Sequence, residues 1–144
     1  MRAGDAYADL WRRPELDPSY GQQALATYQE VLNRFPDAPI APRARERVAY
    51  LENKFAEKEF KAALFYVRLK AYDSAILYLR DLLATYPRAS VAPQALTRLV
   101  ESYRAIGYSE EVTETCGYFR SNHPNAPDLE RVCPLTTPTP TPGA

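Results

Sequence analysis

The sequence predicts an all-α fold, in which antiparallel helical hairpins stack into an α-solenoid of about two and a half repeats. Three observations support this prediction. Three segments of the chain align with one another without gaps, apolar residues recur at helical spacing in each segment, and the helix predicted at the start of each segment stops at a proline. In such a stack each hairpin buries its apolar face against its neighbours, so one continuous core serves the whole domain.

The aligned segments span residues 24–44, 75–95 and 112–132. The first two copies carry the same residue at a series of matching positions. These pairs are Ala24/Ala75, Leu32/Leu83, Pro36/Pro87, Ala38/Ala89, Ala41/Ala92, Pro42/Pro93 and Ala44/Ala95. The third copy keeps Pro124 and Ala126 but begins with Val112, so the repeat is clear in two copies and degenerate in the third.

Each copy predicts a helix, a tight turn and the start of the next helix. The apolar residues share one helical face, and they are Ala24, Tyr28, Val31, Leu32 and Phe35 in the first copy and Ala75, Leu79, Leu82, Leu83 and Tyr86 in the second. Each helix should end before a proline, because the preceding residue is pushed out of the helical region. The three steps are Phe35-Pro36, Tyr86-Pro87 and His123-Pro124. Pro42 and Pro93 then suit the first turn of a new helix, where no amide donor is missed.

The helices between these copies show the same periodicity. A stripe along residues 41–70 predicts one long helix or two nearly collinear ones. Its members are Ala44, Val48, Leu51, Phe55, Ala62, Tyr66 and Leu69. A shorter helix is expected near residues 92–106, and its apolar residues are Leu96, Leu99, Val100 and Tyr103. Ser109 is the expected N-cap of the last full helix, with Glu110 and Glu111 favourable in its first turn.

The spacing of the repeat resembles that of tetratricopeptide (TPR) proteins. Tyr66 to Tyr103 and Pro87 to Pro124 both span 37 positions, close to the TPR period of about 34. Counted back from Pro87, the TPR signature positions hold small, aromatic and large apolar residues in the expected order. These residues are Ala63, Tyr66, Tyr72, Ala75 and Leu79.

The first repeat unit is irregular. Gly4 and Tyr7 match the glycine and tyrosine of a TPR first helix, but the insertion from Trp11 to Pro18 precedes its second helix. By this register the chain begins partway through a helix, so we expect earlier repeats upstream. The N-terminus has no signal-peptide pattern, so either the mature protein begins here or a leader has been removed.

The repeat domain is expected to span residues 1–133, and a Thr/Pro-rich tail at residues 134–144 should be extended and polyproline-like. Lys plus Arg equals Asp plus Glu at 18 each. This balance excludes the electrostatic footprint of a nucleic-acid-binding protein and gives no general reason to seek an anionic membrane surface. No apolar run approaches the roughly 20 residues that span a bilayer.

Two stretches point to a family: LENKFAEKEFKAALFYVRLKAYDSAILYLRDLLATYP at residues 51–87 and ALTRLVESYRAIGYSEE at residues 95–111. They resemble the BamD family of outer-membrane-assembly lipoproteins, in which a long charged helix leads into a Tyr-rich hairpin closed by Tyr-Pro. The resemblance runs from about Gly4 to Pro134 and covers the C-terminal portion of the family only. The lipoprotein signal, the acylated cysteine and the first TPR units of the family are absent from this sequence.

The resemblance implies a non-catalytic protein–protein interaction scaffold, a BamD-like subunit of the outer-membrane protein assembly machinery. It also implies a periplasmic location, with peripheral membrane association through partners. The alternative is a BamD-derived TPR fragment that stabilises another multi-subunit membrane complex, for example a photosynthetic or electron-transfer one. In both cases the partners are other protein subunits of a membrane-associated complex, with no nucleic acid, no direct membrane span and no small-molecule substrate.

No catalytic site, metal site or cofactor is predicted. His123 is the one histidine and suits a packing role at a helix end, and one histidine with two cysteines is too few for a recognisable metal site. Two hypotheses remain open for Cys116 and Cys133: a disulfide, which for a loop of about 15 residues stabilises by roughly 3 kcal/mol, or two separate reduced thiols.

A candidate partner-binding groove follows from TPR geometry, in which the first helix of each hairpin lines the concave surface. The register places seven residues there: Phe60, Leu64, Val67, Arg68, Gln94, Glu101 and Arg104. Phe60 and Leu64 form an apolar anchor flanked by charge if they are exposed. If neighbouring helices bury them, they are core residues instead, and both hypotheses remain open.

Overall fold

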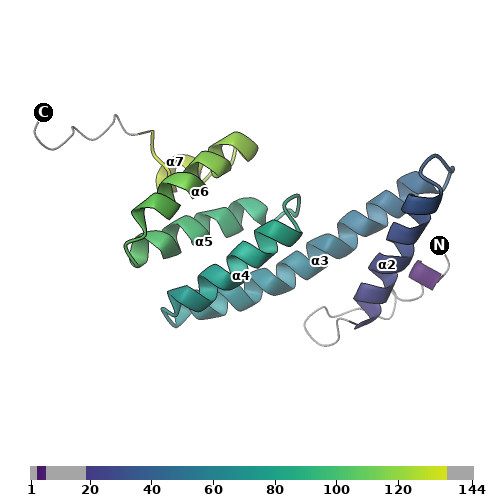
Figure 1. Ribbon diagram of the computed structural model, residues 1–144, viewed down its shortest axis with the longest axis horizontal. Helices are drawn as coiled ribbons and strands as arrows, with labels where there is room; N and C mark the ends of the chain where they lie inside the picture. Colours follow the sequence, from purple (N-terminus) through teal and green to yellow (C-terminus); the bar gives the residue numbers. More distant parts are fainter. Residues whose placement is uncertain (1–2, 6–18, 136–144) are drawn as a thin grey trace, which may run out of the picture.

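The longest helix of the computed structural model packs against both the helix before it and the helix after it (Figure 1). The structure describes residues 3–5 and 19–135. The long helix, α3 (Ala41–Arg68), has 28 residues and is therefore about 42 Å long. The other helices are α2 (Ser19–Arg34), α4 (Tyr72–Thr85), α5 (Ala92–Ala105), α6 (Ser109–Asn122) and the one-turn α7 (Leu129–Val132).

Each helix packs against the next one along the chain from α2 to α6, and α7 packs on both α5 and α6. The described residues contain no strand. The prediction of an all-α solenoid of helical hairpins is therefore confirmed, and residues 41–68 form one helix rather than two. None of the helices in the described ranges is long and apolar enough to cross a bilayer.

The core consists of three clusters in sequence along the solenoid. The first lies between α2 and the first half of α3, and its buried members are Ala24, Tyr28, Ala44, Leu51 and Phe55. The second joins the rest of α3 to α4 and α5, with Ala56, Ala63, Ile76, Leu79, Leu82, Ala89, Ala95, Leu99 and Tyr103 buried. The third holds α7 on α5 and α6 through Leu96, Val100, Phe119, Leu129, Val132 and Cys133.

Tyr86, at the end of α4, joins the first two clusters. Its half-buried ring packs against both, and it stacks on Phe55 of α3 with ring centroids 6.3 Å apart. Nearby, the backbone N–H of Ser90 donates a hydrogen bond of 2.9 Å to Asn53 Oδ1. These two contacts fix the turn between α4 and α5 against the middle of α3.

The same turn occurs in all three copies of the repeat. The helices α2, α4 and α6 end at Arg34, Thr85 and Asn122, directly before the three predicted proline steps. In each turn an alanine N–H donates to the carbonyl three residues earlier, and the pairs are Ala38 to Phe35, Ala89 to Tyr86 and Ala126 to His123. The helix that follows begins at equivalent positions, so α7 occupies the place of α3 and α5 in the third copy.

A second repeated feature ends α3 and α5. The N–H of Ala71 donates to the Tyr66 carbonyl, and the N–H of Tyr108 donates to the Tyr103 carbonyl, a wide bond typical of a helix that ends in a left-handed residue. That residue is Gly107 at φ 77° after α5, but Lys70 at φ 58° after α3. Only glycine adopts this conformation without a steric penalty, so Lys70 is strained where Gly107 is not.

Ser109 is not the N-cap of α6, and this prediction is wrong. Tyr108 precedes the helix, and Ser109 is its first helical residue. Because Gly107 adopts the left-handed conformation, α6 begins one residue earlier than a Ser109 N-cap would require. Glu110 and Glu111 do lie in the first turn of α6.

The predicted stripe on α3 is correct only in its first half. Leu51 and Phe55 are buried as expected, but Ala56 and Ala63 are fully buried in place of Ala62, and Leu69 is exposed. The buried face moves by one residue, about 100° around the axis, where α4 replaces α2 as the packing neighbour. Phe35 is also exposed, because α2 ends before it and no described residue covers its ring.

The start of the chain is tied to the first hairpin. Gly4 lies so close to the Tyr28 ring that an added Cβ would be 2.9 Å from it. The Tyr28 hydroxyl donates a hydrogen bond to Asp5, which also pairs with Arg43 at 3.1 Å and Arg47 at 3.5 Å. Burial and the bond to Asp5 raise the pKa of Tyr28 to about 12.

Some expectations lie outside the described residues. They are the TPR match of Tyr7, the insertion from Trp11 to Pro18 and the extended tail at residues 136–144.

The two left-handed helix ends make a reciprocal prediction. Lys70→Gly should raise the free energy of unfolding by up to about 1 kcal/mol, and Gly107→Lys should lower it by about 1 kcal/mol. Apart from the residues directly before and after it, no residue has an atom within 4 Å of a Cβ placed at Gly107, so the effect is conformational and not a clash. Urea unfolding measures both values. A loss of stability in Lys70→Gly would contradict the assignment of strain.

Asp5 predicts a pH-dependent contribution to stability. The hydrogen bond from Tyr28, aided by Arg43 and Arg47, holds the pKa of Asp5 below its ordinary value of 3.8. Because the folded-state pKa is the lower one, this contribution is present above the unfolded pKa and is lost as pH falls through the folded pKa. Asp5→Asn should therefore lower stability at pH 7 by at most about 1 kcal/mol, and the difference should become smaller at a pH well below 3.8.

Unfolding curves at both pH values measure this difference. The matched control is Asp37→Asn, which changes an exposed aspartate in the turn between α2 and α3. A difference between the native chain and Asp5→Asn that is equal at both pH values would rule out the ionised Asp5 as its source.

Candidate partner-binding surface

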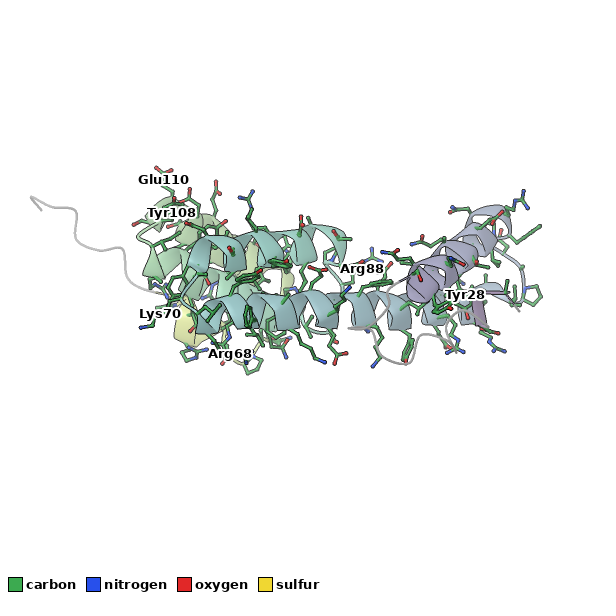
Figure 2. All side chains as sticks on the ribbon, turned by 90° about the horizontal axis from the view of Figure 1, so that it is seen from below. Tyr28, Arg68, Lys70, Arg88, Tyr108 and Glu110 are labelled. Carbon is green, nitrogen blue, oxygen red and sulfur yellow. A yellow bond between two sulfur atoms is a disulfide. The ribbon has the colours of Figure 1, made fainter. Side chains whose placement is uncertain are left out.

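The candidate surface lies on the first helices of two hairpins, α3 and α5. Figure 2 shows α4 on one side of α3 and the Arg68 side chain on the other. The side of α3 that carries Arg68 is therefore not covered by the second helix of its own hairpin.

The seven residues that TPR geometry placed in the groove have different environments. Phe60 is partly buried and packs against the core cluster of α3, α4 and α5. Leu64 and Val67 are half-buried, and Arg68, Gln94 and Arg104 are exposed. Glu101 is half-buried in a network of ion pairs. Of the two expected anchors, Phe60 therefore contributes to the core, and Leu64 retains partial exposure.

Two exposed apolar side chains lie beside Arg68 and were not predicted as site residues. Phe65 is 50% exposed and Leu69 is 61% exposed. They are four residues apart, and Arg68 follows Leu64 and Phe65 by four and three positions, so these side chains are neighbours on the helix surface. We refer to Leu64, Phe65, Arg68 and Leu69 as the α3 patch. The i, i+4 spacing of Phe65 and Leu69 is the sequence feature that could have predicted these two residues as part of the site.

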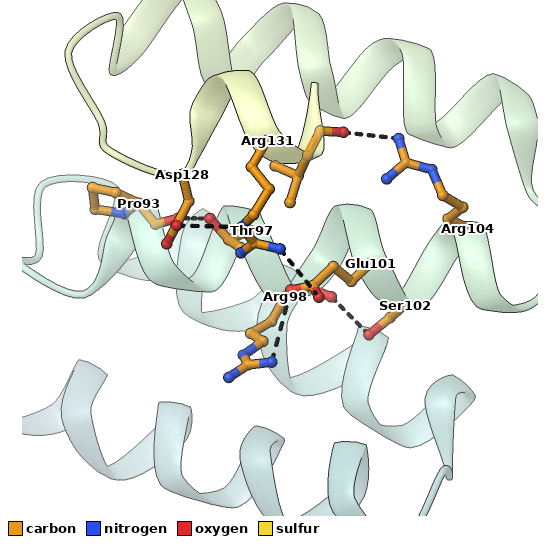
Figure 3. A network of polar contacts seen from close by, with 9 residues as sticks. Pro93, Thr97, Arg98, Glu101, Ser102, Arg104, Asp128 and Arg131 are labelled. Carbon is orange, nitrogen blue, oxygen red and sulfur yellow. Dashed lines mark hydrogen bonds and ion pairs between the residues drawn. The ribbon is translucent and has the colours of Figure 1, made fainter. Parts of the chain in front are cut away.

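Glu101 of α5 links its own helix to α7 (Figure 3). Its carboxylate lies 3.7 Å from Arg98 and 3.9 Å from Arg131, which also pairs with Asp128 at 3.5 Å. Glu101 Oε1 is buried and accepts no hydrogen bond within the described part of the chain, so the Arg98 guanidinium balances its charge. This predicted groove residue thus stabilises the packing of α7 on α5.

Two arginines bind the carbonyl groups at the end of α7. Arg104 Nη2 donates to the Val132 carbonyl at 2.8 Å (Figure 3), and Arg120 Nη2 donates to the Cys133 carbonyl at 2.6 Å. A cation at a helix C-terminus satisfies carbonyls that have no partner in the helix and complements its dipole. Arg120 also binds Glu130 at 2.5 Å and lowers the pKa of that carboxyl.

A disulfide joins Cys116 of α6 to Cys133, the residue that follows α7, and their Cα atoms are 5.5 Å apart. Cys133 is buried in the third core cluster, and Cys116 packs against that cluster. The covalent bond, the two arginine contacts and the apolar cluster together hold the α7 segment against α5 and α6.

The described residues contain no group of three or more histidine, cysteine or acidic side chains that could hold a metal ion. His123 directly follows α6 as its C-cap residue. Its ring packs against Phe119 in a T-shaped arrangement, with ring centroids 6.3 Å apart. The α3 patch, by contrast, has exposed apolar side chains beside a charged one, an arrangement that suits contact with another protein.

Comparison with known proteins identifies the family. The family model described as YfiO, outer membrane lipoprotein, matches residues 1–117. The chain belongs to the YfiO family. The resemblance predicted from residues 51–87 and 95–111 is therefore confirmed.

Several YfiO relatives are named outer membrane protein assembly factor BamD. The protein from Vibrio cholerae is 32% identical over 103 residues, which cover 72% of this chain and 43% of the relative. The protein from Xylella fastidiosa strain 9a5c is 32% identical over 122 residues, which cover 85% of this chain and 41% of the relative. The protein from Caulobacter vibrioides is 30% identical over 108 residues, which cover 75% of this chain and 35% of the relative. The chain thus spans about two fifths of the length of these curated relatives.

The disulfide of this YfiO family member predicts redox-dependent stability. The cysteines are 17 positions apart, and opening a loop of this size should lower the free energy of unfolding by about 3 kcal/mol. Dithiothreitol should therefore shift the urea unfolding curve of the native chain. The Cys116→Ser/Cys133→Ser variant should already have the lower stability, and dithiothreitol should not shift its unfolding curve. Equal curves for the native chain with and without reductant would show that the bond contributes no stability.

Proposed function

We propose that this chain is a non-catalytic scaffold subunit of the outer-membrane protein assembly machinery. The observation that supports this most strongly is membership of the YfiO family together with relatives named as assembly factors. The fold agrees with such a role, because stacked hairpins present long, rigid surfaces to other proteins. The alternative function, in a photosynthetic or electron-transfer complex, gains no support from the relatives that match.

A periplasmic location is part of the proposal. The Cys116–Cys133 disulfide supports it, because disulfides persist in the oxidising periplasm and are rare in the cytosol. We propose that the chain associates with the membrane peripherally, through its partner subunits.

The α3 patch is the proposed contact for a partner subunit. Phe65 and Leu69 supply exposed apolar area. Arg68 is a neighbour of Phe65 on the helix surface, three residues further along the chain. Apolar anchors beside an arginine are the side-chain types that contribute most to protein–protein binding. Gln94 and Arg104 of α5 are exposed as well, and the Val132 carbonyl orients the Arg104 guanidinium.

Rigidity at the C-terminal end favours such a scaffold. Glu101, Arg104 and Arg120 bind residues of the α7 segment, so α5, α6 and α7 form one pre-organised unit. A partner that binds a pre-organised surface loses less free energy to ordering of side chains and loops.

Affinity capture from gently solubilised host membranes tests the function. The tagged chain should co-purify with other subunits of the outer-membrane protein assembly machinery, identified by mass spectrometry. Recovery of an inner-membrane complex and no assembly subunits would refute the assembly role.

Variants of the α3 patch test the proposed contact in the same assay. Phe65→Glu/Leu69→Glu should reduce recovery of the assembly subunits about tenfold, because two exposed apolar anchors are replaced by charges. The matched control is Phe35→Glu, which changes an aromatic residue of similar exposure, 59%, outside the patch. If the patch variant and the control recover partners equally, the contact lies elsewhere on the chain.

A further inference from the structure

A groove runs between α4 and α6, with α5 as its floor. Its wider part has a volume of about 590 Å³ and is lined by Leu83 of α4, Pro87 of the turn after α4, Leu96 of α5, and Tyr118 of α6, among others. A second part of about 290 Å³ is lined by residues that include Leu77 and Tyr108. Arg80 of α4 lines both parts, so the two parts adjoin, and we name them together the α4/α6 groove.

Large apolar side chains along the α4/α6 groove are exposed. Leu77 is 67% exposed, Tyr108 is 49% exposed and Tyr118 is 42% exposed. Leu77 is on the α4 wall, Tyr118 is on the α6 wall, and Tyr108 lies at the start of α6. Exposed apolar residues that gather around a hollow, and are not scattered singly, mark an interaction site.

The shape of this groove suits a helix better than an extended peptide. Both walls are α-helices, whose interior backbone groups already bond within the helix, so they offer no main-chain partners to an extended chain. A bound helix satisfies its own backbone and needs only side-chain contacts. The α4 wall has 14 residues, or about 21 Å, which matches three to four turns of a bound helix.

The charges around the groove specify the character of that helix. Asp73, Glu111 and Glu114 line it, whereas Arg80 is the one basic residue among the lining residues of its two parts. Within the described part of the chain none of these three carboxylates forms an ion pair. Glu111 and Glu114 are three residues apart on α6, so they lie on one face of the α6 wall.

We propose that the α4/α6 groove binds an amphipathic helix of a partner protein, with its apolar stripe on Leu77, Leu83 and Tyr118 and its basic residues against Glu111 and Glu114. The side chains of Arg68 and Tyr108 point to opposite sides of the molecule, so this groove is separate from the α3 patch (Figure 2). The inference does not depend on which complex the chain joins.

The test uses the purified native chain and a designed probe. The probe is a fluorescein-labelled synthetic helix of about 15 residues, with leucines at i, i+3, i+7 and i+10 and lysines along one flank of that stripe. A second peptide replaces each lysine with glutamate. Fluorescence anisotropy should show saturable binding of the lysine peptide and at least tenfold weaker binding of the glutamate peptide.

Variants then locate the site and its charge preference. Leu77→Ser/Tyr118→Ser should weaken the lysine peptide about tenfold, whereas Tyr50→Ser should not, because Tyr50 is half-exposed on α3 outside the groove. Glu111→Lys/Glu114→Lys should weaken the lysine peptide and strengthen the glutamate peptide. This exchange of preference separates binding in the groove from a general loss of structure, and circular dichroism confirms that each variant is helical.

Three outcomes would overturn the proposal. The lysine peptide does not bind the native chain, or both peptides bind equally and ignore the charge reversal. In the third, sedimentation shows that the native chain dimerises and that Leu77→Ser/Tyr118→Ser abolishes the dimer, which assigns the groove to a second copy of this chain. Because the assay contains no assembly subunit, its failure leaves the proposed scaffold function standing, and failure of the membrane capture leaves the groove result standing.

Discussion

The apolar face of α3 is buried by two neighbours in succession, and this burial sets where α2 and α4 lie. The residues up to Phe55 bury their apolar face under α2, and from Ala56 onward the buried face lies under α4 and α5. The change occupies one residue step, so the two neighbours approach from different directions around the same helix. Small residues make the second contact possible, since Ala56 and Ala63 are fully buried there. Tyr86 fills the space where the two clusters meet.

Helix ends were the part of the fold that the sequence predicted best. The proline steps after Phe35, Tyr86 and His123 act through local sterics, and the structure ends helices there. The buried face of α3 was predicted in its first half only, because periodicity assumes one packing direction along a whole helix. Ser109 was misassigned for a related reason: a capping side chain is a weak local preference, and the turn at Gly107 outweighs it.

The candidate surface was predicted less completely than the fold. TPR register located α3 and α5, yet it could not distinguish Phe60, which packs into the core, from Phe65, which is exposed. That distinction depends on where α4 and α5 lie around α3. TPR register also did not predict that Glu101 and Arg104 bind the α7 segment. The third copy of the repeat is degenerate in sequence, and the tertiary contacts of α7 replace the apolar matches that it lacks.

The linear arrangement of the clusters has a consequence for how the domain opens. In a stack with contacts mainly between neighbours, stability is distributed locally and the ends can open without the middle. The C-terminal end is held by a covalent bond and two arginines, whereas α2 packs mainly on α3. Native-state opening is therefore expected to be directional, with amides of α2 exchanging with solvent before those of α5.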